Sequence, residues 1–592
     1  MNLKNPIRNR LVREKKMKTI RKIACLVLCL AFFVSSLASC GKKTEETAAP
    51  DMTEFEETTA ESDRATEEDV TVAVTTDKWE VLAPKITIIV ERDRSLRFEL
   101  SATRADEKAS KNDLFVKGPD EVVEGVTPLI QQMVYERNKA ANDLLHTKIE
   151  YVFWDYVWSK QAEQIKLVVQ GNAADAPDLF VNMYYDLGKA MLNSTLKDVW
   201  SIPDSFFDFK TEGWLTAWME NMSFTGDRAY ILGSDYFLDL MRSITVLPFS
   251  LTLMDEHAAK LAPAIIGESE TLGAGEELSP RFFDLVEEGK WTWDVLGKLC
   301  EAIWEDTDGN GADSVRDRLG IIADVHYGVN ASSFVYSCGE QLTETYTVED
   351  QSSKYYGKQW IRYPDTSAGL DQIFEAVNSV FEGPGSLGTD FTSEGATPEE
   401  PGLAFHHAKF AQGETLFAGV NTLAALEDDV FQQMTDYYSV VPCPKVDAAK
   451  SYNTVMDYTG DAGGINVNLS PRKAKVLTAF IQYCTENSPA IREEFMQIVT
   501  KYKTTVYNQG TDRMLEIIYN GIIYGRDKMV DDMVMVGGAS HEERWHVLLK
   551  KDLFCAGGSD YIAAEYRSLL PRKQSILSTV MERWYRLPKV EE

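Results

Sequence analysis

The chain has 592 residues, of which 44% are hydrophobic, and it carries a formal net charge of −31 at pH 7. So acidic a chain argues against nucleic acid and against an anionic lipid surface as ligand, because both would repel it. Roughly 500 residues follow residue 85, enough for two or more domains that each bury a hydrophobic core.

The N-terminus has the pattern of an export signal. Basic residues between positions 18 and 22 precede an apolar run over residues 23–37, which is shorter than the about 20 residues needed to cross a bilayer. The run ends in LASC (37–40), which resembles the lipobox of bacterial lipoproteins. The resemblance implies that residues 1–39 are a lipoprotein signal peptide and that Cys40 carries the lipid. An ordinary signal whose cleavage site contains a cysteine is the alternative.

An acidic segment separates this signal from the folded body. Residues 40–84 are rich in Glu and Thr and poor in apolar residues, so they cannot bury enough surface to fold. They are predicted to form a solvated, self-repelling tether. A lipid anchor followed by such a tether would hold the body at the extracellular face of the cell membrane.

Strands and helices are predicted to alternate in the first part of the body. KITIIVE (85–91), KIEYVFW (148–154) and APDLFVNMYY (176–185) are apolar runs rich in β-branched and aromatic residues, which predict strands. Between them, residues 127–147 and 159–173 have the apolar spacing of amphipathic helices. This β-α-β-α-β order predicts an α/β fold with a largely parallel sheet and helices on both faces.

Further elements are predicted downstream. Helices are expected at residues 293–306, 473–488 and 513–524, and short strands at 227–235, 415–420 and 437–444. The cysteines of the body are scattered, with no disulfide framework and no metal-ligand spacing. They are interpreted mostly as small buried hydrophobic side chains: Cys300, Cys338, Cys443, Cys484 and Cys555.

The stretch EDTDGNGADSVRDRLG (305–320) has the spacing of an EF-hand-type calcium loop. With Asp306 as position 1, oxygen-bearing side chains fall at positions 3, 5, 9 and 12, and a glycine at position 6 allows the sharp turn. The predicted ligands of this structural Ca²⁺ are Asp306, Asp308, Asn310, Ala312 through its carbonyl, Ser314 and Asp317. The alternative is a solvated turn, because position 12 is aspartate instead of the longer glutamate.

Six segments, in this order, resemble the extracellular solute-binding proteins of ABC importers, in the carbohydrate-binding branch found in Gram-positive bacteria. They are QQMVYERNKAANDLL (131–145), GNAADAPDLFVN (171–182), FTGDRAYILGSDY (224–236), LVEEGKWTWDVLGKLCEAIWEDTDGNGADSVRDRLG (285–320), FAQGETLFAGV (410–420) and YYSVVPCPKVD (437–447). The fourth is the most specific, because in the family a G-K-W-T-W-D turn starts a helix that leads into a D-x-N-G-D-G-type loop and then a strand.

The resemblance implies a two-lobed type II periplasmic-binding fold, in which crossing strands join two α/β lobes and a hinged cleft closes on the ligand. It divides the body into lobe 1 (85–200), lobe 2 (201–440), a return to lobe 1 (441–505) and C-terminal helices closing on lobe 2 (506–592). It also implies a monomer that binds an oligosaccharide and delivers it to an ABC permease in the membrane, without a catalytic cofactor.

Aromatic, carboxylate and amide side chains near the ends of predicted strands are the candidate ligand-binding residues, because sugar rings stack on aromatic faces and their hydroxyls bond to polar groups. They are Asn182, Tyr184, Tyr185, Trp214, Trp218, Asp235, Tyr236, Asp457 and Tyr458. Trp291 and Trp293 of the G-K-W-T-W-D turn are assigned to structure, with Thr292 or Asp294 capping the helix that follows.

The catalytic patterns that the sequence suggests do not hold. HEERWH (541–546) has its histidines five positions apart, whereas a zinc-binding pair on one helical face is four apart. GGASH (537–541) lacks the frame of a nucleophile elbow. No enzyme is predicted. The alternatives to a transport receptor are a cell-surface glycoside hydrolase and a lipoprotein that senses ligand for a membrane kinase.

Overall fold

The computed structural model describes Trp79 and residues 95–588, with gaps at 102–110, 155–159, 174, 325–328, 340, 390–402, 458, 502–508, 533–543 and 546–558. The chain divides into two compact units, residues 1–73 and 74–592, and the second holds every element described below. The signal peptide, Cys40, the tether apart from Trp79 and the predicted strand at 85–91 lie outside the described residues. In the part of the chain that is described, no helix is long and apolar enough to cross a membrane.

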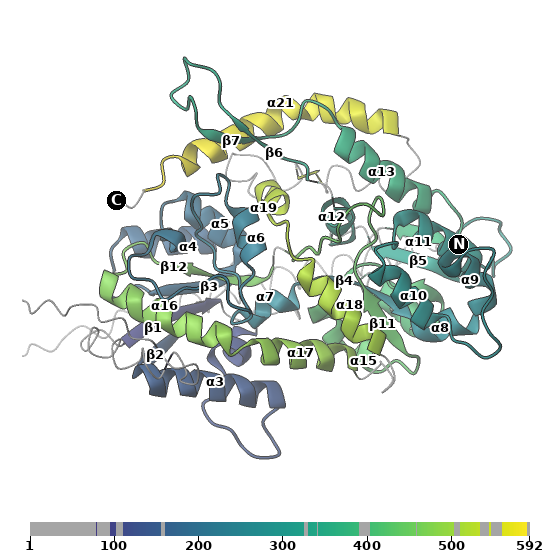
Figure 1. The fold of residues 1–592 in the computed structure, drawn as a ribbon, viewed down its shortest axis with the longest axis horizontal. Coiled ribbons are helices and arrows are strands. Elements are labelled where there is room, and N and C mark those ends of the chain that lie inside the picture. Colours follow the sequence, from purple (N-terminus) through teal and green to yellow (C-terminus); the bar gives the residue numbers. More distant parts are fainter. Residues whose placement is uncertain are drawn as a thin grey trace, which may run out of the picture. The chain divides into compact units, whose positions relative to one another are not determined.

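The first sheet has the strand order β12-β3-β1-β2 (Figure 1). β2 and β3 run parallel to β1, and β12 lies antiparallel beside β3. The strands are β1 (Ser95–Ser101), β2 (Lys148–Trp154), β3 (Leu179–Met183) and β12 (Asp461–Ile465). The helices packed with this sheet and with one another are α3 (Leu129–Leu145), α4 (Gln161–Gln170), α5 (Tyr184–Leu192), α16 (Pro471–Glu486) and α17 (Pro489–Lys501). We call this part lobe 1.

The packing of lobe 1 follows from its apolar spacing. In α3, the apolar residues Ile130, Val134, Ala141 and Leu145 are buried, because they recur on one face of the helix. Both β3 and β12 are buried along their whole length, as expected for strands covered on both faces. Lobe 1 therefore has its own hydrophobic core.

The second sheet has the order β10-β4-β9-β5-β8, with β11 paired to β4. Its strands are β4 (Thr245–Ser250), β5 (Leu319–Asp324), β8 (Ser386–Thr389), β9 (Thr415–Phe417), β10 (Asn421–Thr422) and β11 (Tyr438–Val441). The surrounding helices are α8 (Leu251–Glu256), α9 (Ala258–Ile266), α10 (Ser279–Glu287), α11 (Trp293–Ile303), α12 (Val329–Tyr336), α13 (Ala368–Phe381), α14 (Leu403–Ala411), α15 (Asp429–Gln432) and α18 (Gln509–Asn520). We call this part lobe 2.

Two crossing segments pair with each other between the lobes. Ile244 and Met456 form an antiparallel bridge, Thr245 N donates to Val455 O (2.9 Å), and Asp457 N donates to the carbonyl of the residue before Ile244 (2.8 Å). A third passage leads from α17, which packs on α3 of lobe 1, to α18, which packs on β11 of lobe 2. Such paired crossing segments are the arrangement in which two lobes can move about a hinge.

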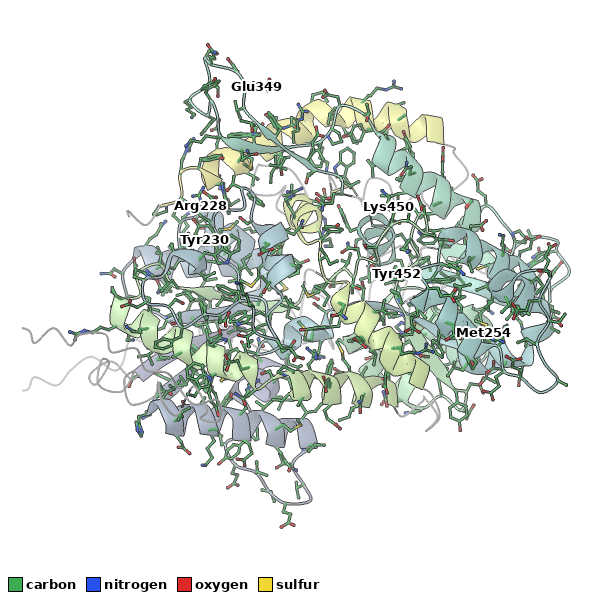
Figure 2. The ribbon with its side chains drawn as sticks, in the orientation of Figure 1. Arg228, Tyr230, Met254, Glu349, Lys450 and Tyr452 are labelled. Carbon is green, nitrogen blue, oxygen red and sulfur yellow. The ribbon has the colours of Figure 1, made fainter. Side chains whose placement is uncertain are left out.

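The remaining elements lie beside these lobes. They are the π-helical turn η1 (Asp113–Lys117), η2 (Val199–Ser201), α6 (Thr216–Met222), α7 (Leu238–Arg242), the β6 (Glu344–Thr347) and β7 (Gln359–Arg362) hairpin, η3 (Leu423–Glu427), α19 (Arg526–Asp532) and α21 (Ser559–Trp584). α21 contacts β7, α13 of lobe 2 and α5 of lobe 1. Figure 2 places Arg228 and Tyr230 near the C-terminal end of α21, and Glu349 on the hairpin.

The structure confirms the predicted two-lobed α/β fold, because each sheet has its own helices and the chain crosses between them. The strands predicted at 148–154 and 176–185 correspond to β2 and β3, and the helix at 293–306 to α11. β1 was missed, because SLRFELS places charged residues between its apolar ones. Residues 201–242 have contacts in lobe 1, where Leu232 bridges Gly463.

Three local predictions have clear outcomes. The strand expected at 227–235 is wrong, because this segment forms only isolated bridges. Trp291 and Trp293 are buried, as expected, whereas Thr292 makes no side-chain cap hydrogen bond. The cysteines at positions 300, 338, 443 and 484 are free and buried, as predicted, and Cys555 lies outside the described residues.

Candidate functional site

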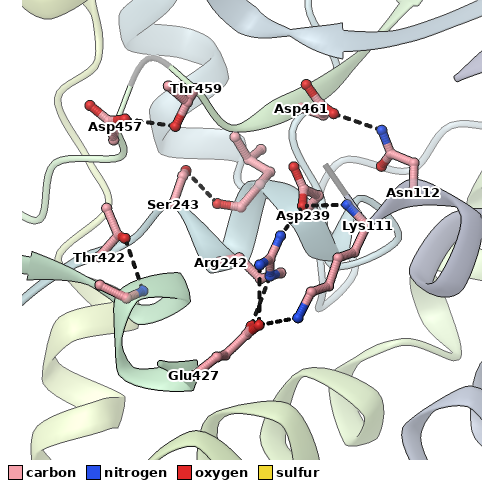
Figure 3. A network of polar contacts seen from close by, with 12 residues as sticks. Lys111, Asn112, Asp239, Arg242, Ser243, Thr422, Glu427, Asp457, Thr459 and Asp461 are labelled. Atoms are coloured by element: carbon pink, nitrogen blue, oxygen red, sulfur yellow. Dashed lines mark hydrogen bonds and ion pairs between the residues drawn. The ribbon is translucent and has the colours of Figure 1, made fainter. Parts of the chain in front are cut away.

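A group of polar side chains lies where the two lobes meet (Figure 3). We define the polar cluster by its members: Lys111, Asn112, Asp239, Arg242, Thr422, Glu427, Asp457, Thr459 and Asp461. Lobe 1 contributes the residues before η1 and at the start of β12, α7 contributes an aspartate and an arginine, and η3 of lobe 2 contributes a glutamate. Because α7 contacts η1, η3 and β12, it brings these segments together beside the crossing strands.

Arg242 is the centre of the polar cluster. Its Nη1 donates to Asp239 Oδ1 (2.6 Å), and its Nε and Nη2 donate to Oε1 and Oε2 of Glu427 (2.8 and 3.1 Å). Lys111 joins the same carboxylates, since its ammonium donates to Glu427 and its backbone N–H donates to Asp239 Oδ1 (3.2 Å). Lys111 precedes η1, which packs on α3 of lobe 1, whereas Glu427 ends η3, which directly follows β10 of lobe 2. These contacts therefore connect the lobes.

The polar cluster continues along lobe 1 and the crossing strand. Asn112 Nδ2 donates to Asp461 Oδ2 (2.7 Å), and Thr459 Oγ1 donates to Asp457 Oδ2 (2.6 Å). Figure 3 shows these pairs on the far side of Arg242 from Glu427. Carboxylates from several separate segments of the chain therefore lie together where the lobes meet.

The turn η3 fixes Glu427 in position. Thr422 begins the turn, because its hydroxyl accepts a hydrogen bond from Ala425 N (3.3 Å). Leu423 and Leu426 are fully buried, and the turn packs against β10 and α15 of lobe 2 and against α17 of lobe 1. Glu427, at the end of the turn, is thereby directed toward Arg242.

The polar cluster is partly open to water, and it holds more carboxylates than basic side chains. The side chains of Lys111 and Glu427 are 38% and 20% exposed, whereas those of Arg242 and Asp239 are 6% and 5% exposed. Burial raises the pKa of Glu427, but the hydrogen bonds and charges of Arg242 and Lys111 outweigh it and hold the pKa below its ordinary value. Glu427 is therefore an ionised hydrogen-bond acceptor.

The predicted ligand-binding residues are divided between several places. Asp457 lies in the polar cluster, and Tyr458 lies outside the described residues. Tyr184 is buried at the start of α5 and donates from its hydroxyl to Met456 O (3.0 Å) on the crossing strand. Tyr185 follows it and is also buried.

Four other predicted residues lie inside lobe 1 or in its packing. They are Asn182, Trp214, Trp218 and Tyr236, all buried. Trp214 donates from Nε1 to Gln482 Oε1 (3.0 Å), and the ring of Trp218 meets that of Tyr184 edge-on, with ring centres 5.8 Å apart. These rings are occupied by protein partners and present no open face to a sugar.

Asp235 lies at another point between the lobes. It accepts hydrogen bonds from Arg492 Nη1 (2.7 Å) and from the hydroxyl of Tyr519 on α18 (2.9 Å). Burial raises the pKa of Asp235 to about 7, although the charge of Arg492 and the bond from Tyr519 lower it. Arg492 and Tyr519 line a pocket between α17 and α18.

Sequence reasoning missed the central members of the polar cluster. Lys111 and Glu427 stand at the edges of segments that the prediction left unassigned. A signal for the other two was present, because Asp239 and Arg242 are the charged residues of the otherwise apolar stretch FLDLMRSITVLPF (237–249). A charged pair three positions apart within such a stretch indicates a buried polar contact.

The predicted calcium loop lies between α11 and β5 of lobe 2. Asp306, Asp308 and Asp317 each place one carboxylate oxygen within 4.8 Å of the others, close enough to share one ion. Gly309 and Gly311 have φ angles of 72° and 77°, which glycine adopts without strain and which let the loop turn tightly. The aspartates thus fit a hard cation such as Ca²⁺.

The other predicted ligands bond within the loop. Ser314 Oγ donates to Asp308 Oδ2 (3.0 Å), Ser314 N donates to Asp317 Oδ2 (2.8 Å), and Ala312 N donates to Asn310 Oδ1 (2.7 Å). Burial raises the pKa of Asp317, but its hydrogen bonds outweigh burial and lower it. The loop is therefore formed by its own contacts and keeps a charged carboxylate at its base.

No family model matches the chain, and no curated protein matches it. Among solved structures, the chain is similar to the sugar-binding protein MalE from Xanthomonas citri at 12% identity, with 84% of this chain and 100% of that chain covered and a TM-score of 0.47. The lacto-N-biose-binding protein of an ABC transporter from Bifidobacterium longum is similar at 12% identity, 83% and 98% coverage and a TM-score of 0.44.

The GacH receptor of Streptomyces glaucescens, solved unliganded and with acarbose, is similar at 12% identity, 81% and 98% coverage and a TM-score of 0.43. These three structures are of binding proteins. Because all three TM-scores are below 0.5, the fold assignment for this chain rests on its own two sheets and crossing segments.

Proposed function

We propose that the protein is the extracellular solute-binding receptor of an ABC importer, which captures an oligosaccharide between its lobes and delivers it to a membrane permease. The polar cluster carries this proposal, because charges from both lobes meet beside the crossing strands and two of them are partly open to water. A ligand bound there would touch both lobes, so its binding energy would favour their closed arrangement. The six sequence segments that resemble the solute-binding family, in the same order along the chain, support the same function.

The chemistry of the polar cluster suits a polyhydroxylated ligand. The carboxylate of Glu427 can accept hydrogen bonds from hydroxyls and the ammonium of Lys111 can donate them, because these two side chains are 20% and 38% exposed. Hydrogen bonds to charged groups contribute about 1.5–3 kcal/mol each. Hydroxyls of a sugar could thus replace the partly hydrated contact between the lobes.

The hydrolase alternative is disfavoured by the ionisation of Glu427, the carboxylate of the polar cluster whose side chain is 20% exposed. A glycoside hydrolase needs a general acid with a raised pKa next to a second carboxylate. The pKa of Glu427 is lowered, so this residue would be a poor acid. Burial raises the pKa of Glu99 well above its ordinary value and that of Asp235 to about 7, but both residues are 0% exposed and cannot reach a substrate.

A glycan panel tests the proposed function. The full chain is titrated by calorimetry against each oligosaccharide, and the recovered glycan is then examined for cleavage. Binding without cleavage is expected, and Glu427→Gln should weaken it by about 10- to 100-fold, the loss of one charge-assisted hydrogen bond. Glu349→Gln, on the exposed hairpin, is the matched control and should bind as wild type. Cleavage of any hit would favour the hydrolase.

We also infer that Cys40 anchors the protein at the extracellular face of the membrane. The proposal rests on the lipobox-like LASC and on the tether that follows it. Two acyl chains would anchor it stably, because each buried methylene contributes about 0.8 kcal/mol. Cys40→Ser should move the protein from the detergent phase to the aqueous phase in a partition assay. Equal partitioning of both proteins would contradict the anchor.

For the loop at 306–317 we propose a structural Ca²⁺. The three clustered aspartates support it, and a bound ion would stabilise the native state by mass action. Calcium should raise the thermal midpoint of the wild type, and Asp306→Ala should remove that gain. Asp350→Ala, in an exposed turn of the hairpin, is the control and should keep it. An Asp306→Ala protein that gains as much as the wild type would place the effect outside this loop.

A further inference from the structure

A pocket of about 540 Å³ opens between α17 and α18. One wall comes from α17 and the preceding part of lobe 1, including Glu212, Arg492 and Glu493, and the other wall comes from α18 of lobe 2. None of the residues that line this pocket belongs to the polar cluster. Phe495 of α17 packs on Phe115 with ring centres 6.1 Å apart.

At the base of the pocket, an arginine and an aspartate pair between the lobes and neutralise each other's charge. Arg492 is 7% exposed and donates to Asp235, which also accepts from the hydroxyl of Tyr519. The Arg492 guanidinium lies 4.1 Å from the centre of the Tyr519 ring. The guanidinium is therefore already hydrogen-bonded to a carboxylate and stacked on an aromatic ring, so it is poorly available to bind an anion.

The rim of the pocket is acidic. Glu493 and Glu212 approach Arg492 at 3.2 and 3.7 Å, so three carboxylates, with the buried Asp235, already surround one guanidinium. Asp512 and Glu516 lie four positions apart on the exposed face of α18 and also line the pocket. Neither of these two has an ion-pair partner among the described residues. The rim therefore carries more negative than positive charge and attracts cations.

The pocket also has an apolar part. Met496 and Leu515 line it from opposite walls and are 4% and 5% exposed. A cavity of this volume is far larger than a bare metal ion needs, and apolar walls do not suit one. The combination of carboxylates and apolar surface fits an alkyl or ring body that carries amino groups.

We propose that this pocket is a second binding site, distinct from the polar cluster, for a small organic cation such as a diamine or polyamine. Ammonium groups would pair with Asp512 and Glu516 on lobe 2 and with Glu212 and Glu493 on lobe 1, while the carbon chain contacts the apolar walls. A cation held by both walls links α17 to α18. Its occupancy would therefore stabilise the approach of the two lobes independently of any sugar.

The test uses the full chain and 1,5-diaminopentane, with 1,5-pentanediol as a neutral probe of the same length and inorganic phosphate as an anionic probe. Calorimetry at two salt concentrations should detect the diamine, with weaker binding at high salt, and neither of the other probes. The double variant Asp512→Asn, Glu516→Gln should bind the diamine at least tenfold more weakly, and both positions are exposed, so folding should not suffer.

A matched control separates the pocket from the general acidity of the chain. Glu301→Gln removes an exposed carboxylate of α11, outside the pocket, and should leave diamine binding unchanged. Equal weakening by Glu301→Gln and by the double variant would overturn the proposal, as would equal binding of pentanediol or binding of phosphate at this pocket. The glycan panel is unaffected by either result, so the two proposals fail separately.

Discussion

Two of the contacts that join the lobes differ in chemistry. In the polar cluster, the contact of Lys111 with Glu427 is charged, and both side chains are partly exposed. Along α21 the contact is aromatic and dry. Trp584 is 1% exposed, and its ring centre lies 4.8 Å from that of Phe224 and 5.5 Å from that of Tyr230.

The far side of the α21 contact combines aromatic stacking with a buried ion pair. Tyr585 stacks on Trp360 of β7, with ring centres 5.8 Å apart and planes 11° apart. Lys573 Nζ lies 2.9 Å from Asp531 Oδ1, and both side chains are almost fully buried. α21 therefore holds the side of lobe 1 near α5 to the hairpin and to α13.

The difference indicates where the lobes can part. A partly hydrated ion pair contributes about 0–1 kcal/mol, because water replaces its partner when it separates. Removing a buried aromatic side chain costs about 3–5 kcal/mol. We therefore expect the polar cluster to open and close around a ligand while the α21 contact stays in place. The following predictions test this comparison in order of effect.

Trp584→Ala should have the largest effect. Loss of the buried ring, and of its hydrogen bond to Thr225 (2.8 Å), should lower the free energy of unfolding by about 3–5 kcal/mol. Urea unfolding of the full chain, followed by circular dichroism, measures it. The control Tyr356→Ala removes an aromatic that is 54% exposed and should change stability by less than about 0.5 kcal/mol. Similar losses in the two variants would remove the basis of the comparison.

Lys573→Met should come next, with a loss of about 3 kcal/mol, because it removes the ammonium that lies 2.9 Å from the buried Asp531 carboxylate. The matched control is Lys298→Met, which breaks an exposed pair with Asp294 at 2.7 Å and should cost about 0.5 kcal/mol or less. Thermal and urea unfolding give both values. The comparison would break down if the exposed pair proved as costly as the buried one.

Glu427→Gln should have the smallest effect on stability at neutral pH, and its effect should depend on pH. The folded-state pKa of Glu427 is lowered, so the stabilisation is present above the unfolded-state pKa of about 4.3 and is lost as pH falls through the lower folded value. Between about pH 5 and pH 3, the wild type should therefore lose more thermal stability than Glu427→Gln. Parallel pH curves for the two proteins would show that this carboxylate is not held by the cluster.

The sequence predicted the architecture better than the site. Runs such as KIEYVFW and WDVLGKLCEAI carry their periodicity locally, so β2 and α11 could be found without knowledge of the rest. Trp214 and Trp218 were predicted to face ligand, because composition cannot distinguish an aromatic that packs in a core from one that lines a site.

The polar cluster could not be predicted for a different reason. Lys111 and Glu427 are 316 positions apart, and only the crossing of the chain between lobes brings them together. Asp457 was predicted because it lies near a strand end that the expected fold directs toward the cleft, and the structure places it in the polar cluster. Contacts of long sequence separation depend on topology, which local patterns do not specify.

Hydrogen exchange with and without a bound oligosaccharide tests the central claim most directly. The full chain and a glycan found in the panel are compared by mass spectrometry of peptides. Binding should slow exchange in peptides containing Lys111–Lys117, Leu423–Glu427 and Val455–Ile465, and should leave residues 562–584 of α21 unchanged, because that contact is already closed. Unaltered exchange in the first three peptides, or an equal change along α21, would contradict a ligand site at the polar cluster and a fixed contact at α21.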